Sequence, residues 1–149
     1  MVQLLLLKGY NMAFRTTQNI EHNIDRMAKI LNFQDMPKWY TLRFAIFISL
    51  TLEKNMKIDL DEKIDFENGI GYKADVITGR NKTDLKGVQG DYTDLIAVMV
   101  SNAHNCKIED VNTLEKYLER HCVRGFEYLE KSLNEKSSIF LWLKNEFKL

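Results

Sequence analysis

The sequence predicts an all-α fold, a compact bundle of about five helices interrupted by a long irregular central loop. A single proline among 149 residues leaves long segments free to be helical. Apolar residues recur at helical spacing in several separate segments. Five of the seven glycines fall between residues 55 and 90. This length suits one hydrophobic core, so we expect a single domain over residues 13–149, preceded by a leader or disordered arm over residues 1–12.

The first eleven residues do not form a secretion signal. The apolar run Leu4 to Leu7 is too short, no basic region precedes it and no small-residue cleavage site follows. We expect Met12 to be the biological start, because Lys8 and Gly9 require purine-rich codons at ribosome-site spacing upstream of it. The alternative is that Leu4 to Leu7 form a short strand or a disordered arm.

Residues 13–16 are a short extended candidate, and Thr16 or Thr17 can cap the helix that follows. Over residues 17–31 the apolar side chains form one stripe: Ile20, Ile24, Met27, Ile30 and Leu31. This pattern predicts an amphipathic surface helix. Residues 32–35 then make a tight connection.

The stretch Asp35 to Leu52 is the densest apolar run in the chain. Asp35 is a suitable N-cap and Pro37 falls in the predicted first turn, where its missing N–H costs nothing. From Trp39 onward apolar residues lie on every side, so this helix must be surrounded by other elements or by another subunit. It is too short and too polar to cross a bilayer, which takes about 20 apolar residues.

Strand, helix, turn and helix in this order are the layout of ribbon-helix-helix and related DNA-binding units. Many helical hairpins share it. The N-terminal half is therefore predicted to be ribbon-helix-helix-like.

Residues 55–90 predict a long irregular connection with an acidic run from Asp59 to Glu67 and weak alternation in residues 70–77, compatible with one short hairpin. Helices are expected again from about residue 95 to Ala103, after Asp110 to about Leu133, and after Ser137 or Ser138. Gly125, inside the second of these, is expected to permit a close helix crossing.

No motif indicates an active site, and no cofactor is expected. His104, Cys106, His121 and Cys122 form the only cluster with metal-ligand atoms, and their spacing is wrong for known zinc fingers. Cys122 is predicted to be a core residue. Asp59, Asp61 and Asp65 fit a solvated acidic loop, and residues 79–87 lack the lysine motif of a phosphate-binding loop.

Charge is uneven although the formal net charge is zero. Residues 1–57 carry eight Lys and Arg against four acids, whereas residues 58–71 carry one Lys against five acids. Several basic and hydroxyl side chains of the first half could share one surface that contacts phosphates. The candidate DNA-binding residues are Arg15, Thr17, Arg26, Lys29, Lys38 and Arg43. A solvated helix face is the alternative.

Three stretches in order resemble the DndE family of DNA phosphorothioation (sulfur-modification) proteins. They are Phe14-Arg15-Thr16 with the 42–50 core, Gly90 to Leu95, and His121 to Leu129. The resemblance spans roughly residues 13–133. It implies a helical oligomer, a tetramer, that works beside desulfurase, sulfotransferase-like and ATPase subunits without a catalytic centre of its own. It also implies binding of duplex or nicked DNA.

The function expected is thus an accessory, non-catalytic DNA-binding subunit of a cytoplasmic phosphorothioation system, with no membrane contact. His121, Arg124 and Gly125 are assigned to structure or assembly, a role open to Arg43 as well. Two alternatives stay open. One is a structural adaptor with little DNA affinity, and the other is a ribbon-helix-helix transcriptional regulator.

Overall fold

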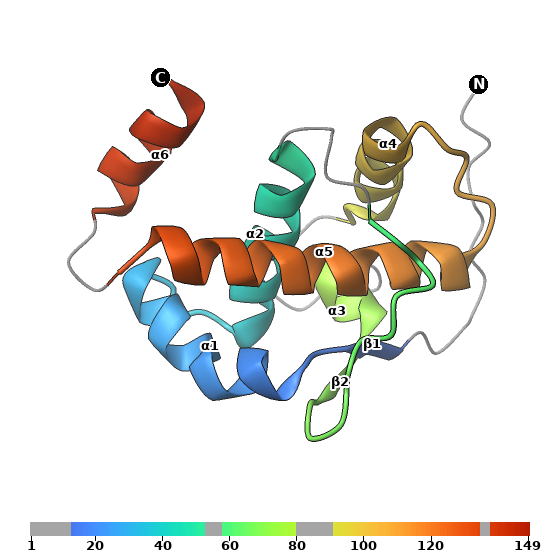
Figure 1. The fold of residues 1–149 in the computed structure, drawn as a ribbon, viewed down its shortest axis with the longest axis horizontal. Coiled ribbons are helices and arrows are strands. Elements are labelled where there is room, and N and C mark those ends of the chain that lie inside the picture. Colours follow the sequence, from blue (N-terminus) through green and yellow to red (C-terminus); the bar gives the residue numbers. More distant parts are fainter. Residues whose placement is uncertain (1–12, 53–57, 80–90, 135–137) are drawn as a thin grey trace.

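The computed structural model describes residues 13–52, 58–79, 91–134 and 138–149. Its elements are β1 (Ala13–Arg15), α1 (Gln18–Ile30), α2 (Lys38–Thr51), β2 (Gly71–Lys73), α3 (Ala74–Thr78), α4 (Thr93–His104), α5 (Val111–Ser132) and α6 (Ile139–Phe147) (Figure 1). The predicted mostly helical fold is confirmed. The described residues form six helices rather than about five. The additional helix is the short α3, which lies where an irregular segment was expected. The predicted leader lies outside the described residues.

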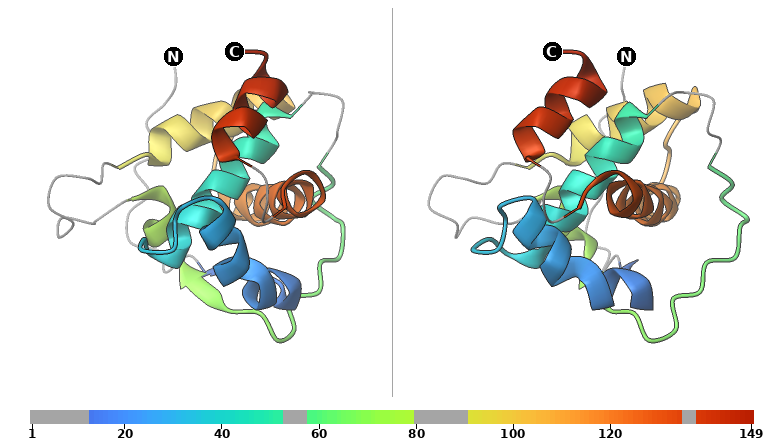
Figure 2. Two further views of the ribbon diagram at one scale, coloured as in Figure 1. Left: turned by 90° about the vertical axis from the view of Figure 1, so that its left-hand side faces the viewer. Right: turned by 60° about the vertical axis from the view of Figure 1, so that its left-hand side comes forward.

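The crossing of α2 with α5 organises the core. These two helices make the most extensive contact between elements in the described structure, and Figure 2 shows α2 running past α5, which is viewed nearly end-on. Gly125 of α5 lies at the crossing, where an added Cβ would be 1.8 Å from the carbonyl oxygen of Ala45. The close crossing expected at Gly125 is therefore confirmed.

The second helix is buried on nearly every side, as its composition predicts. Leu42, Ala45 and Ile46 have no exposed surface. The helices that pack against α2 are α1, α3, α4 and α5 of the same chain. A neighbouring subunit is therefore not required to cover most of this helix.

The start of α2 differs from the prediction. Pro37 is the N-cap, no side chain bonds at that cap, and Asp35 lies in the preceding turn. A proline disfavours helical geometry at the residue before it, so Met36 resists a helical conformation. The helix therefore begins only at Lys38, and the prediction of Asp35 as N-cap was wrong.

Three other helix starts follow the expected capping chemistry. Thr17, Asp110 and Ser138 each accept a hydrogen bond from the backbone N–H three residues later, at the starts of α1, α5 and α6. Such a bond satisfies one of the amide groups that have no partner in the first helical turn. The predicted caps of these helices are confirmed.

The two strands form an antiparallel pair within one chain. Ala13 lies opposite Lys73, Phe14 opposite Tyr72 and Arg15 opposite Gly71. The short hairpin considered for residues 70–77 is therefore not formed: Gly71–Lys73 pair with the N-terminal strand, and the chain is helical from Ala74. Phe14 is completely buried, so this pairing closes the core next to α3 and α5. Among the described residues, no helix is long and apolar enough to cross a bilayer.

Candidate nucleic-acid interface

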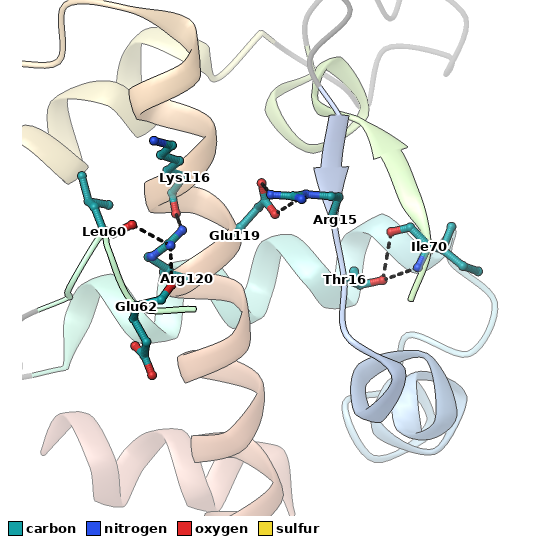
Figure 3. Close-up of polar contacts among 8 residues, drawn as sticks. All are labelled: Arg15, Thr16, Leu60, Glu62, Ile70, Lys116, Glu119 and Arg120. Carbon is teal, nitrogen blue, oxygen red and sulfur yellow. Dashed lines mark hydrogen bonds and ion pairs between the residues drawn. The ribbon is translucent and has the colours of Figure 1, made fainter. Parts of the chain in front are cut away.

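Arg15 reaches from β1 to the middle of α5. Its Nε donates to Oε2 of Glu119 over 3.1 Å, and Figure 3 shows the guanidinium facing that carboxylate. The Glu119 side chain is fully buried, whereas 51% of the Arg15 side chain is exposed. The guanidinium also lies over the Phe66 ring, 4.3 Å from its centroid. Arg15 is therefore fixed in place while part of it faces solvent.

Arg26 reaches the same face of α5 from α1. Its Nη2 lies 3.8 Å from Oε1 of Glu130, and Asn19 donates to the other oxygen of Glu130 over 3.0 Å. Glu119 and Glu130 are eleven residues apart, about three helical turns, so they point to one side of α5 about 16 Å apart. Arg15 and Arg26 consequently lie along one side of the molecule.

Lys29 lies one turn beyond Arg26 on α1. Both line a surface hollow of about 400 Å³, which we call the α1–α2 hollow; its other lining residues are Ile30, Asn32 and Gln34. Lys29 is exposed and has no ion pair within the part of the chain that the structure describes. The structure thus brings two of the predicted cations to one concave site.

Lys38, at the start of α2, turns toward α1. Its Nζ lies 3.8 Å from Oδ1 of Asp25, the residue next to Arg26. The Asp25 side chain is 84% exposed and that of Lys38 is 47% exposed. Lys38 therefore extends the same basic region around α1.

The two threonines before α1 have different environments. Thr17 is half-buried and is occupied as the N-cap, with its hydroxyl 3.3 Å from the backbone N of Ile20. Thr16 is fully buried. Its hydroxyl accepts from the backbone N of Ile70 (Figure 3), and its backbone N donates to the Ile70 carbonyl. Thr16 anchors the loop before β2 and is out of reach of a phosphate.

Arg43 is buried in the core and lies apart from these cations. Only 9% of it is exposed. Its Nε donates to the Ile77 carbonyl over 2.7 Å and its Nη2 to the Val76 carbonyl over 3.2 Å, so it joins α2 to α3. The Trp39 ring lies against the guanidinium, and burial lowers the pKa of Arg43. Of the two roles that the sequence left open for Arg43, its geometry favours the structural one.

His121 is part of a hydrogen-bonded chain that the sequence did not predict. Its Nδ1 lies 2.7 Å from Oγ of Ser49, and its Nε2 lies 2.8 Å from Nε2 of His104. Only one proton fits between the two facing ring nitrogens, so one ring donates and the other accepts. Burial is the main reason that the pKa of His121 falls to about 3. The chain joins α2, α4 and α5 with neutral side chains.

Ser49 and His121 have the spacing of a nucleophile and its base. Each is only 1% exposed, so a substrate has no access to the hydroxyl. Cys122, beside His121, is completely buried as predicted. The neighbouring Arg124 is half-buried, and burial lowers its pKa. Within the described residues, no group of three His, Cys, Asp or Glu side chains could hold a metal ion.

Arg120 and Glu119 are important residues that the sequence reading missed. Arg120 donates to the carbonyl oxygens of Asp59, Leu60 and Glu62, so it holds the acidic segment against α5. Figure 3 shows Arg120 beside Leu60 and Glu62. The only feature of the sequence that could have indicated either residue was its charge next to the predicted buried stripe of an amphipathic helix. Many exposed residues share that signal, so it could not single out these two.

Comparison with known families identifies the family of the chain. The model of the family described as DNA sulphur modification protein DndE matches residues 13–137. No curated protein and no solved structure matches the chain. The matched range contains the strands, the α2–α5 crossing and every cation of the candidate interface, and it ends before α6. The chain therefore belongs to the DndE family of DNA sulphur modification proteins.

Proposed function

We propose that the chain is an accessory, non-catalytic DNA-binding subunit of a cytoplasmic DNA phosphorothioation system. Membership of the DndE family supports the pathway. The observation that carries DNA binding is the alignment of Arg15 and Arg26 on one side of α5, extended by Lys29 and Lys38 around α1. The ligand of these four side chains is duplex or nicked DNA. In the cell the chain works with the other subunits of the phosphorothioation machinery.

The ion pairs at this surface are weak enough for phosphates to replace them. The pairs of Arg26 and Lys38 are 3.8 Å long and partly exposed, and such pairs contribute about 0 to 1 kcal/mol. Arg15 can keep its Nε bond to Glu119 while its exposed part meets a phosphate. About 16 Å of α5 separates Glu119 from Glu130, which corresponds to the rise of roughly five base pairs along the axis of B-DNA.

Electrostatic binding of this kind predicts a strong dependence on salt. Substituting Arg15→Ala or Lys38→Ala should weaken duplex binding regardless of base sequence and reduce the slope of log affinity against log salt by about 1 per phosphate contact. Fluorescence anisotropy of labelled intact and nicked duplexes between low and moderate salt measures both effects.

Lys63→Ala is the matched control, because Lys63 is an exposed lysine in the acidic segment and its loss should leave the affinity unchanged. If Lys63→Ala and Lys38→Ala had equal effects, net charge rather than this surface would account for binding. Absence of binding to either duplex at micromolar protein and low salt would refute the proposal.

The adaptor function is the second candidate, and α6 favours it. Phe140, Leu141 and Leu149 are 77%, 58% and 82% exposed, and exposed apolar groups of this kind are typical of protein contact sites. Both candidate functions include assembly of the chain into a homo-oligomer, a tetramer. A stable complex with partner enzymes that lacks DNA affinity would select the adaptor.

The regulator alternative has weaker support. A ribbon-helix-helix dimer pairs its N-terminal strands between subunits, whereas β1 pairs here with β2 of its own chain. One edge of β1 is thereby occupied within the subunit. We therefore do not adopt this alternative.

A further inference from the structure

The α1–α2 hollow combines three kinds of chemistry in one concave site. Its lining contains the cations Arg26 and Lys29, the amides Asn32 and Gln34, and the aliphatic Ile30. All five residues come from the last turns of α1 and the connection to α2. A volume of about 400 Å³ lies within the range of small-ligand sites.

The end of a helix that borders this hollow carries partial negative charge, which opposes anion binding. Here, however, the last carbonyl groups of α1 are bonded by the following turn. The carbonyl oxygens of Met27, Ala28 and Lys29 accept from the backbone N of Leu31, Phe33 and Asn32 at 3.0, 2.6 and 3.2 Å. With these groups satisfied, the positive charge of the hollow comes from Lys29, which has no ion pair among the described residues, and from Arg26, whose pair with Glu130 is 3.8 Å long and partly exposed.

We propose that the α1–α2 hollow binds a single unstacked nucleotide of DNA. The phosphate lies between Arg26 and Lys29, the base packs against Ile30, and the Asn32 and Gln34 amides are available for its polar edge. This inference rests on the proposed function and specifies the part of the DNA that the site recognises.

The shape of the site favours an unstacked nucleotide over a phosphate within a regular duplex. A duplex phosphate touches a protein surface from outside and leaves a concave site unfilled. A base fills it only after leaving the stack, which costs a few kcal/mol in a paired duplex and least where a base is unpaired. The hollow should therefore favour DNA with unpaired bases, as at mismatches and frayed strand ends.

Calorimetric titration of the full chain with three separate probes tests the hollow. The probes are deoxyadenosine monophosphate, deoxyadenosine and inorganic phosphate. The nucleotide should bind at least about tenfold more tightly than either fragment, since it engages cations and amides together. Lys29→Ala should weaken nucleotide and phosphate by about tenfold. Gln34→Ala should weaken the nucleotide alone. Lys63→Ala is the control, and circular dichroism verifies the fold of each variant.

A nucleotide that binds no more tightly than phosphate, or a Gln34→Ala variant with unchanged nucleotide affinity, would overturn the inference. Duplex binding of Arg15→Ala and Lys38→Ala, two sites outside the hollow, separates this failure from that of the proposed function. If those variants lose duplex affinity but no nucleotide binds, the proposed function stands and the inference fails. If nucleotide binds and no DNA does, the hollow is supported as a nucleotide site and DNA is excluded as its source.

Discussion

Glu119 carries a carboxyl group inside the protein. Its carboxylate is fully buried against Arg15, and Glu115 lies nearby. Burial raises its pKa to about 7, while Arg15 acts in the opposite direction and Glu115 adds to the increase. The folded protein thus holds a proton here more tightly than the unfolded chain, in which a glutamate has a pKa near 4.5.

This difference predicts that Glu119 makes stability fall as pH rises. Between pH 4.5 and 7 the folded state binds more protons than the unfolded state, so the free energy of unfolding decreases with pH in that window. Glu119 should account for a decrease of roughly 1 to 3 kcal/mol. Urea unfolding at several pH values between 4.5 and 8, for the natural chain and Glu119→Gln, measures it.

The difference between the two proteins isolates Glu119 from the histidines. His104 and His121 have lowered pKa values, so protonating them in the unfolded state destabilises the fold as pH falls below about 6.5. Both proteins share this opposing effect. Stability curves that run parallel from pH 4.5 to 8 would show that Glu119 does not titrate in this range.

At the scale of elements, the approach of α2 and α5 depends on one missing side chain. Gly125→Ala places a Cβ where the carbonyl of Ala45 already lies, so the helices must move apart. We expect the free energy of unfolding to fall by about 3 kcal/mol, the upper part of the range for overpacked cores. On an exposed helix the same change would stabilise by about 1 kcal/mol. Urea denaturation distinguishes these signs.

Gly71→Ala is the matched control. A Cβ at Gly71 meets no atom within 4 Å, so this variant should unfold at nearly the same urea concentration as the natural chain. An equal loss in both variants would mean that glycine flexibility, rather than the helix crossing, causes the effect at Gly125.

Local patterns predicted most of the helices. The predictions of the stripe of α1, the all-round apolar surface of α2 and the caps Thr17 and Asp110 depend only on residues close together in the sequence. These predictions were correct. The pairing of β1 with β2 joins residues about 58 positions apart, so no local pattern contains it. The start of α2 was wrong because the restriction that Pro37 imposes on Met36 outweighed the capping preference of Asp35.

The candidate site was less predictable than the fold. Arg15, Arg26, Lys29 and Lys38 were singled out by their charge and position in the sequence. The acidic partners of Arg15, Arg26 and Lys38, which lie on α1 and α5, come from tertiary contacts. Arg43 has the same residue type but lies in the core. The exposure of a basic side chain depends on which elements pack over it, and composition does not contain that information.

At the scale of the whole molecule, the apolar residues of α6 remain uncovered in a single chain. Of this helix only Trp142 is buried, against Tyr128 of α5, and α6 lies at the edge of the molecule (Figure 1). The apolar side chains of Phe140, Leu141 and Phe147 therefore form an exposed surface that is available for contact with another protein. Since α6 lies beyond residue 137, this surface is outside the range matched to the family.

This surface predicts that assembly, rather than folding, depends on the outer side chains of α6. The double variant Phe140→Ser and Leu141→Ser should shift sedimentation velocity profiles toward smaller species. Its free energy of unfolding, measured under conditions where the chain is monomeric, should stay within about 0.5 kcal/mol, as is usual for exposed positions. Leu95→Ser, at another exposed leucine, is the control. An unchanged profile would show that α6 does not mediate self-association.

Arg120 attaches the acidic segment to α5 through main-chain oxygens of residues 59, 60 and 62. Every residue type offers such an oxygen, so the segment can exchange its side chains without loosening the tether. The guanidinium itself has no equivalent replacement, because a lysine supplies neither its planar fork nor its spread of donors. Mutational tolerance should therefore be higher at Asp59 and Glu62 than at Arg120.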